Sequence, residues 1–190
     1  MKQLLITFLI FMYSITSMAQ TEHMTFKGVP IDGQLNAFVS ALEKQGYTKK
    51  LQNDDGAILK GDFAGKSDCT IFVVATKVSK TVWKVAIKFP EKASWYSLKD
   101  EYKTFRESYT NKYGKPVTYE FFSDPYYEGD GYELQALRNK KCTYVSFFTS
   151  SRGNISLEMT DDSCVQVGYE DGINVEIFKR EKNQVVLEDI

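Results

Sequence analysis

Histidine is almost absent from this chain, which excludes most catalytic and metal sites that depend on imidazole. The single histidine is His23. A Ser-His-Asp triad or a Cys-His pair needs an imidazole held beside the nucleophile, and the usual zinc and iron sites use several. His23 precedes the first predicted strand, so we expect a solvated residue in a flexible segment.

Cysteine is also scarce, with Cys69, Cys142 and Cys164 as the three thiols. Because three is an odd number, one thiol stays free or pairs between chains if the other two bond. The spacings match no zinc pattern, and isolated cysteines commonly serve as small buried apolar residues. Cys142 and Cys164 can form a disulfide if their strands are neighbours.

The charges show no basic block and no cofactor motif. Lysine and arginine total 24 against 25 aspartates and glutamates, for a net charge of −1, so nucleic acid is not an expected partner. Gly65-Lys66-Ser67 suggests a phosphate loop, but that motif requires glycine where Lys60 stands. The acidic loop Asp124 to Glu133 does not fit an EF-hand. We predict neither a cofactor nor a metal.

The N-terminus has the pattern of a secretory signal peptide over residues 1–19. Lys2 precedes an apolar core from Leu4 to Ile15, and small residues at Ser17 and Ala19 fit cleavage before Gln20. The alternative is an uncleaved anchor, but this apolar core is shorter than the roughly 20 residues that a span requires. We therefore expect an exported protein, periplasmic or secreted, with no membrane span after cleavage.

The first half of the remaining chain, 20–92, reads as one helix followed by four strands. After a short extended piece, Phe26 to Ile31, Asp32 precedes an apolar stripe at helical spacing. The stripe is Leu35, Phe38, Val39 and Leu42. The predicted strands are Tyr47 to Gln52, Ala57 to Phe63, Cys69 to Thr76 and Val82 to Phe89.

The second half, 93–190, reads similarly with one additional strand. Ser97 and Asp100 suggest a capping box before a helix with the stripe Leu98, Tyr102, Phe105 and Tyr109, ended by Gly114. The predicted strands are Val117 to Phe122, Tyr132 to Asn139, Cys142 to Thr149, Asn154 to Thr160 and the additional Val165 to Tyr169. Asp171-Gly172 suggests a hairpin into a strand at Ile173, Val175 and Ile177; Val185 to Ile190 is a last strand or a tail.

The two halves suggest duplication. CTIFVVAT at Cys69 resembles CTYVSFFT at Cys142, and each precedes a turn and an alternating strand. Chance similarity of two β-rich segments is the alternative. The predicted fold is α+β: two tandem helix-plus-four-strand repeats in one compact domain, with an antiparallel sheet, helices packed on one face, and the other face open.

Several segments resemble an uncharacterised family of small exported bacterial proteins. They are FKGVPIDGQLNAFVSALEKQGY, GDFAG, VAIKFPEKASWYSL and NKYGKP. The resemblance implies export and an α+β fold, and it carries no catalytic residues. The predicted layout is also similar in architecture to the tandem repeats of secreted β-lactamase-inhibitor proteins, which implies a protein-binding role only weakly, because fold does not determine function.

The loop SDPYYEGDGY is the best candidate for binding. Tyr126, Tyr127 and Tyr132 offer apolar area with a hydroxyl group, which suits recognition of proteins or sugars; the alternative is that the rings fold back onto the sheet. Acids are plentiful, but no pair stands out: Glu120, Asp124, Glu128, Asp130, Glu133, Glu158, Asp161 and Asp162. The sequence thus favours a non-enzymatic envelope module that binds an unknown protein or saccharide. A carboxylate hydrolase resembling glycosidases, or a structural envelope protein, are the alternatives.

Overall fold

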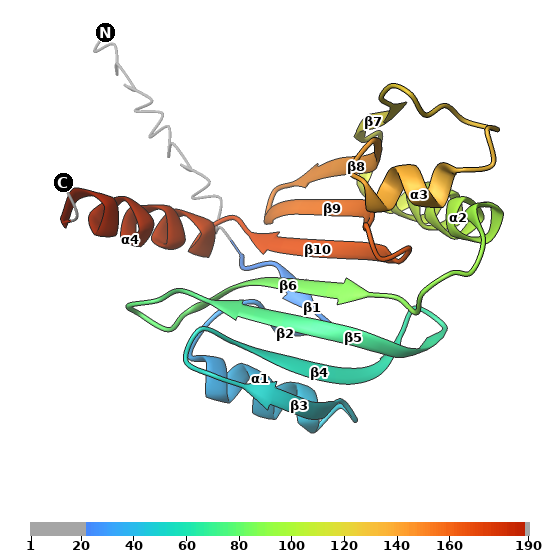
Figure 1. Cartoon of the computed structure of the whole chain (residues 1–190). Helices are drawn as coiled ribbons and strands as arrows, with labels where there is room; N and C mark the ends of the chain where they lie inside the picture. The colour runs from blue at the N-terminus through green and yellow to red at the C-terminus, as the bar shows by residue number, and fades with distance from the viewer. Residues whose placement is uncertain (1–21, 189–190) are drawn as a thin grey trace, which may run out of the picture.

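The computed structural model describes residues 22–188, and Figure 1 shows their arrangement. The predicted signal peptide lies outside these residues. A small hairpin, β1 (Thr25–Phe26) and β2 (Val29–Pro30), precedes an eight-stranded antiparallel sheet of order β3-β4-β5-β6-β10-β9-β8-β7. The sheet strands are β3 (Thr48–Gln52), β4 (Gly56–Phe63), β5 (Lys66–Ala75), β6 (Val82–Lys88), β7 (Val117–Phe122), β8 (Cys142–Ser150), β9 (Gly153–Met159) and β10 (Val165–Asp171).

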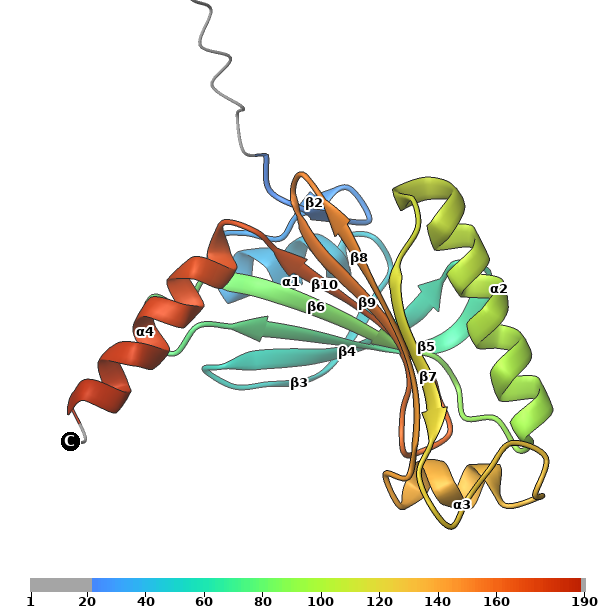
Figure 2. The same ribbon diagram turned by 90° about the horizontal axis from the view of Figure 1, so that it is seen from above.

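The predicted α+β class is confirmed, with four helices beside the one antiparallel sheet. The sheet consists of two antiparallel groups, β3 to β6 and β7 to β10, which meet where β6 pairs with β10. At this seam Ala86 lies opposite Gly168. Figure 2 shows that the strands of the two groups are strongly turned relative to each other, as the twist of antiparallel strands requires.

Helices α1 (Leu35–Glu43) and α2 (Trp95–Tyr113) cover one face of this sheet (Figure 2). Both predicted apolar stripes are buried. The start of α2 was predicted wrongly: its N-cap is Ser94, whose hydroxyl accepts from the Ser97 amide at 3.2 Å. The helix therefore begins about one turn before the predicted capping box, with Trp95 inside it.

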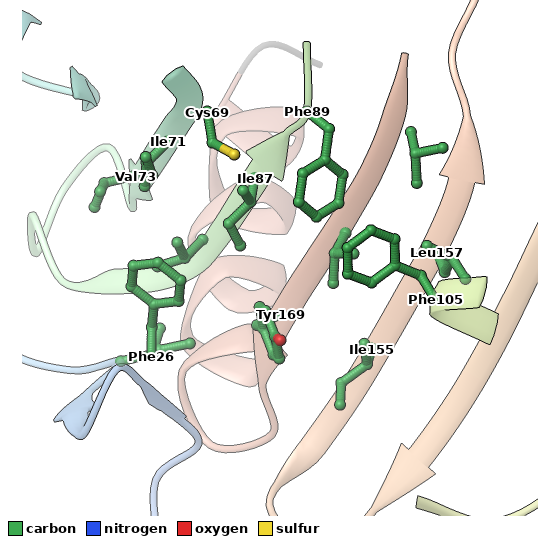
Figure 3. Close-up of a cluster of buried hydrophobic side chains, with 14 of the residues drawn as sticks. Phe26, Cys69, Ile71, Val73, Ile87, Phe89, Phe105, Ile155, Leu157 and Tyr169 are labelled. Atoms are coloured by element: carbon green, nitrogen blue, oxygen red, sulfur yellow. The ribbon is translucent and has the colours of Figure 1, made fainter. Parts of the chain in front are cut away.

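The main core lies between these helices and the sheet (Figure 3). Ile71, Ile87 and Leu157 from three strands are fully buried there. The rings of Phe89 and Phe105 stack at 4.4 Å between centroids and join β6 to α2. Because these buried side chains come from both strand groups, their burial stabilises the sheet across the β6–β10 seam.

Two predicted strands are helices. The segment Tyr132 to Asn139 contains α3 (Glu133–Arg138), where buried Ala136 and Leu137 and strong helix formers override the short alternation. The segment after Asp171-Gly172 forms α4 (Asn174–Glu188), not a hairpin strand. Asp171 is the reason, because its carboxylate accepts from the backbone amides of Ile173 and Asn174 and so caps this helix.

The segments aligned at Cys69 and Cys142 do not hold equivalent places in the sheet. Cys69 lies on β5, the third strand from the β3 edge, whereas Cys142 opens β8, the second strand from the β7 edge. The error follows from counting α3 as a strand. Counted outward from the β6–β10 seam, β5 holds the same position as β9, and β4 holds the same position as β8.

Candidate functional site

The sheet face opposite α1 and α2, called the open face below, carries a continuous row of apolar and small side chains. Strand register places one residue of each strand in this row. From edge to edge it runs Leu51, Ile58, Phe72, Ala86, Gly168, Ser156, Phe147 and Val117. Leu51, Phe147 and Val117 are among the most exposed large apolar residues of the described chain. The row therefore presents apolar ends to solvent.

The middle of the row is made of small residues. A Cβ atom on Gly168 would lie 2.6 Å from the Ser156 hydroxyl oxygen, so a larger residue here would overlap the Ser156 side chain. Ala86, beside it on β6, is buried. The row on the open face thus has small residues at its centre and larger side chains toward both edges.

Ion pairs flank this small-residue centre. Lys84 contacts Glu170 at 2.8 Å and Lys88 contacts Asp162 at 2.7 Å. The hydrogen bond that Lys88 donates to Asp162 raises the pKa of Lys88. Burial opposes ionisation of Asp162, but the hydrogen bonds from Lys88 and Thr160 outweigh it and lower the pKa. These charges are paired within the chain, so the exposed apolar side chains of the row are the groups on this face best placed to contact a partner.

An apolar groove lies where α4 passes the end of the β3–β6 group. Phe178 of α4 stacks on Trp83 at 4.1 Å between centroids, which fixes the helix against the sheet. A hollow of about 400 Å³ is lined by Phe178, Val185 and Val186 on one side and by Val74 on the other. A smaller hollow of about 230 Å³ on Leu51, Ile58 and Phe72 shares Val74 with it, so the two are contiguous.

The β7–β9 side of the open face is also exposed and apolar. A hollow of about 450 Å³ there is lined in part by Val145, Phe147, Glu158 and Asp161. Tyr119 of the edge strand packs against Phe147, with ring centroids 6.4 Å apart. Val117 and Phe121 lie on the same face of β7 as Tyr119, because they alternate with it along the strand.

The predicted tyrosine loop divides into one anchored ring and two exposed ones. Tyr126 packs against the core, and its hydroxyl accepts a hydrogen bond from the Asn139 side chain at 2.9 Å. Tyr127 and Tyr132 are 64% and 61% exposed. Asp130 accepts from the backbone amides of both exposed tyrosines, at 3.1 and 2.7 Å. The loop is therefore braced by its own acids and presents two rings to solvent.

A lysine ties this loop to α2 and to β8. Glu128 contacts Lys99, whose ammonium group lies 5.5 Å from the centre of the Tyr144 ring, and the Tyr144 hydroxyl donates to Glu128 at 3.2 Å. The hydrogen bond from Lys99 holds the pKa of Glu128 below its usual value. A general acid in glycoside hydrolysis needs a raised pKa, so Glu128 does not fit that role.

The prediction for His23 was wrong, because the ring is held in place. Its Nδ1 lies 3.1 Å from Asp171 and its Nε2 lies 3.3 Å from Asp32. Asp171 is fully buried and also accepts from the Met24 amide at 2.7 Å. Long-range contacts between the segment before β1 and the end of β10 have no local sequence signal, which is why pattern analysis missed them.

The remaining candidates are the cysteines, a metal site and a membrane-spanning helix. All three cysteines are free and buried, so Cys142 and Cys164 are not bonded to each other. In the described part of the chain, no three His, Cys, Asp or Glu side chains are placed to hold a metal ion. Among residues 22–188, no helix is both long and apolar enough to cross a membrane.

The acids considered for hydrolysis are mostly engaged in structural contacts. Glu120 contacts Arg106, Glu158 accepts from Gln166 at 2.9 Å, and Glu133 accepts from the Gly129 amide at 2.9 Å. Comparison with protein-family models, with curated proteins and with solved structures finds no match to this chain.

Proposed function

We propose that this chain is an exported, non-enzymatic binding module of the cell envelope, and that its open face holds a partner. The observation that carries the proposal is the row of apolar and small side chains that crosses all eight strands and ends in exposed Leu51 at one edge and in exposed Phe147 and Val117 at the other. Exposed contiguous apolar surface is costly in water and commonly marks an interaction site. The apolar lining of the two contiguous hollows beside α4 favours a protein partner over a saccharide.

The tyrosine loop is the second element of this site in the proposal. Tyr127 and Tyr132 project from a loop that Asp130 and the contact between Lys99 and Glu128 hold in place. A fixed loop loses little conformational entropy on binding, and tyrosine provides large contact area at low entropic cost.

We also propose that the scaffold arose by duplication of a unit with one helix and four strands. The strand order supports it: α1 precedes β3 to β6, α2 precedes β7 to β10, and the fourth strands of the two groups pair at the centre. The open face would then be shared equally between two related halves, which gives one wide binding surface without an interdomain linker.

The test is capture from envelope extract with the mature protein immobilised at matched density. The variants Leu51→Ser with Phe147→Ser and Tyr127→Ala with Tyr132→Ala alter the open face and the loop. The control is Tyr96→Ser, because Tyr96 is 81% exposed on α2, a helix that covers the opposite face. We expect one protein captured by the wild type and the control and lost with the open-face variant.

One further arm separates a protein partner from a saccharide. Extract digested with proteinase before capture should lose the partner if it is a protein and retain it if it is a saccharide. Equal capture by the open-face variant and the wild type contradicts the proposal, as does capture that only Tyr96→Ser abolishes.

A further inference from the structure

The two edges of the sheet differ in how they are protected against pairing with another strand. At one edge, β3 carries Lys49 and Lys50, and its register with β4 shifts between Lys49 and Leu51. Lysines and irregular register are the usual means by which an edge strand avoids pairing with another chain. At the other edge, opposite β3 in Figure 1, β7 has neither feature.

Strand β7 is a regular and apolar edge. Its six residues pair with β8 without a register shift, and the strand contains no lysine or proline. Val117, Tyr119 and Phe121 share one face and are 60%, 51% and 50% exposed. Its one charge, Glu120, is matched by Arg106 of the same chain. Such an edge satisfies what strand addition requires, namely unpaired backbone groups and apolar side chains beside them.

We infer that β7 pairs with β7 of a second copy of this chain, in antiparallel orientation, to give one continuous sheet across a twofold dimer. A twofold interface presents the same patch on both copies, so the patch must complement itself. An antiparallel pair of identical strands meets this condition, and the open faces of both copies then lie on the same side of the joined sheet.

The side chains select one register for this pair. Opposed residues in a sheet share a face, so an axis through one residue keeps the apolar side chains of both copies together. With Tyr119 opposite Tyr119 of the second copy, Val117 lies opposite Phe121 and Thr118 opposite Glu120. Shifting the axis by one residue toward the C-terminus opposes the two Glu120 carboxylates. Shifting it toward the N-terminus moves Pro116 inward, from opposite Phe122 to opposite Glu120.

The strand ends are also complementary in charge in this register. Lys115 precedes β7 and Asp124 follows it. Antiparallel pairing about Tyr119 places Lys115 of one copy opposite Ser123 of the other, next to Asp124, at both ends of the pair. With the axis shifted toward the N-terminus, Lys115 lies opposite Phe121 instead, so the charges favour the Tyr119 axis over that shift.

The experiment measures the mass of the mature protein by sedimentation over a concentration series. We expect association of the wild type, and about tenfold or greater weakening in both Tyr119→Lys and Tyr119→Glu, since each places like charges opposite each other at the axis. An equimolar mixture of these two variants should regain the two-chain mass. Thr48→Lys on β3, at an exposed residue outside the apolar row, is the matched control and should associate like the wild type.

The outcomes are decisive in both directions. Circular dichroism of each variant tests whether the fold is retained, and we expect that it is because Tyr119 is half exposed. A wild-type chain that stays monomeric at millimolar concentration overturns the inference, as does a dimer that Tyr119→Lys leaves intact. Failure of the mixture to regain the dimer overturns the proposed register. Recovery of the dimer in the mixture but not in either variant by itself, with Thr48→Lys associating like the wild type, supports the register.

Discussion

Asp171 provides the sharpest test of how the fold is held, because one buried carboxylate serves four partners. It accepts from the backbone amides of Met24, Ile173 and Asn174 at 2.7, 3.0 and 2.8 Å, and from the His23 ring at 3.1 Å. These contacts join the segment before β1, the end of β10 and the start of α4. Asp171 therefore fixes both α4, which lines the apolar groove, and the N-terminal segment.

Replacing Asp171 with alanine leaves three backbone amides without an acceptor in a site that is closed to solvent. Each unsatisfied buried donor costs about 1–3 kcal/mol. Partial relaxation of the helix start reduces the sum, so we expect a loss of about 3–5 kcal/mol in the free energy of unfolding. Asp171→Asn keeps one acceptor oxygen for Ile173 and Asn174 but turns a donor toward Met24, so its cost should be smaller.

Urea unfolding followed by circular dichroism measures both losses as a fall in the midpoint at unchanged slope. The control is Glu170→Ala, the preceding residue, whose side chain is partly exposed on the open face and pairs with Lys84. An ion pair of this kind contributes about 1 kcal/mol or less. A loss below about 1 kcal/mol for Asp171→Ala, or one equal to that of the control, refutes the reasoning.

Three further predictions address the open face, the loop and α4. Gly168→Val should cost about 1–3 kcal/mol, read as a lower melting temperature, because its side chain would overlap the neighbouring strand; Gly168→Ala should cost less, and equal melting of both variants contradicts the packing. The lowered pKa of Glu128 means that its ionised form is stabilised in the folded state, so its contribution to the free energy of unfolding is present above its usual pKa of 4.5 and is lost as the pH falls below that value. Replacing Lys99 with methionine should flatten the dependence of the free energy of unfolding on pH in this range, and an unchanged dependence would count against the contact. Phe178→Ala should cost about 1.5–3 kcal/mol and shift Trp83 fluorescence to longer wavelength, whereas an unshifted spectrum would show that α4 does not cover this ring.

The local patterns in the sequence predicted the helix faces and most of the strands. The stripes of α1 and α2 were visible because spacing of three and four residues is set by the helix itself. The strand CTIFVVAT is apolar on both faces, with Phe72 and Val74 on the open face. The structure places them in the two contiguous hollows beside α4.

The errors occur where long-range contacts decide the outcome. The segment Tyr132 to Asn139 alternates over too few residues to distinguish a strand from one helical turn and a half, and burial of Leu137 decides in favour of the helix. Asp171-Gly172 has the composition of a hairpin turn, but the caps and the contact with Met24 start a helix instead. His23 is ordered only by Asp32 and Asp171, which are distant in the sequence.

The most direct test of the binding proposal is a footprint of the captured complex. Surface labelling of the mature protein, free and bound, reports which side chains lose solvent contact, read by mass spectrometry at each peptide. The account predicts protection of Leu51, Phe147 and Tyr127, with Tyr96 on α2 labelled equally in both states. Protection centred on α1 and α2, with the open face labelled as in the free protein, would contradict it.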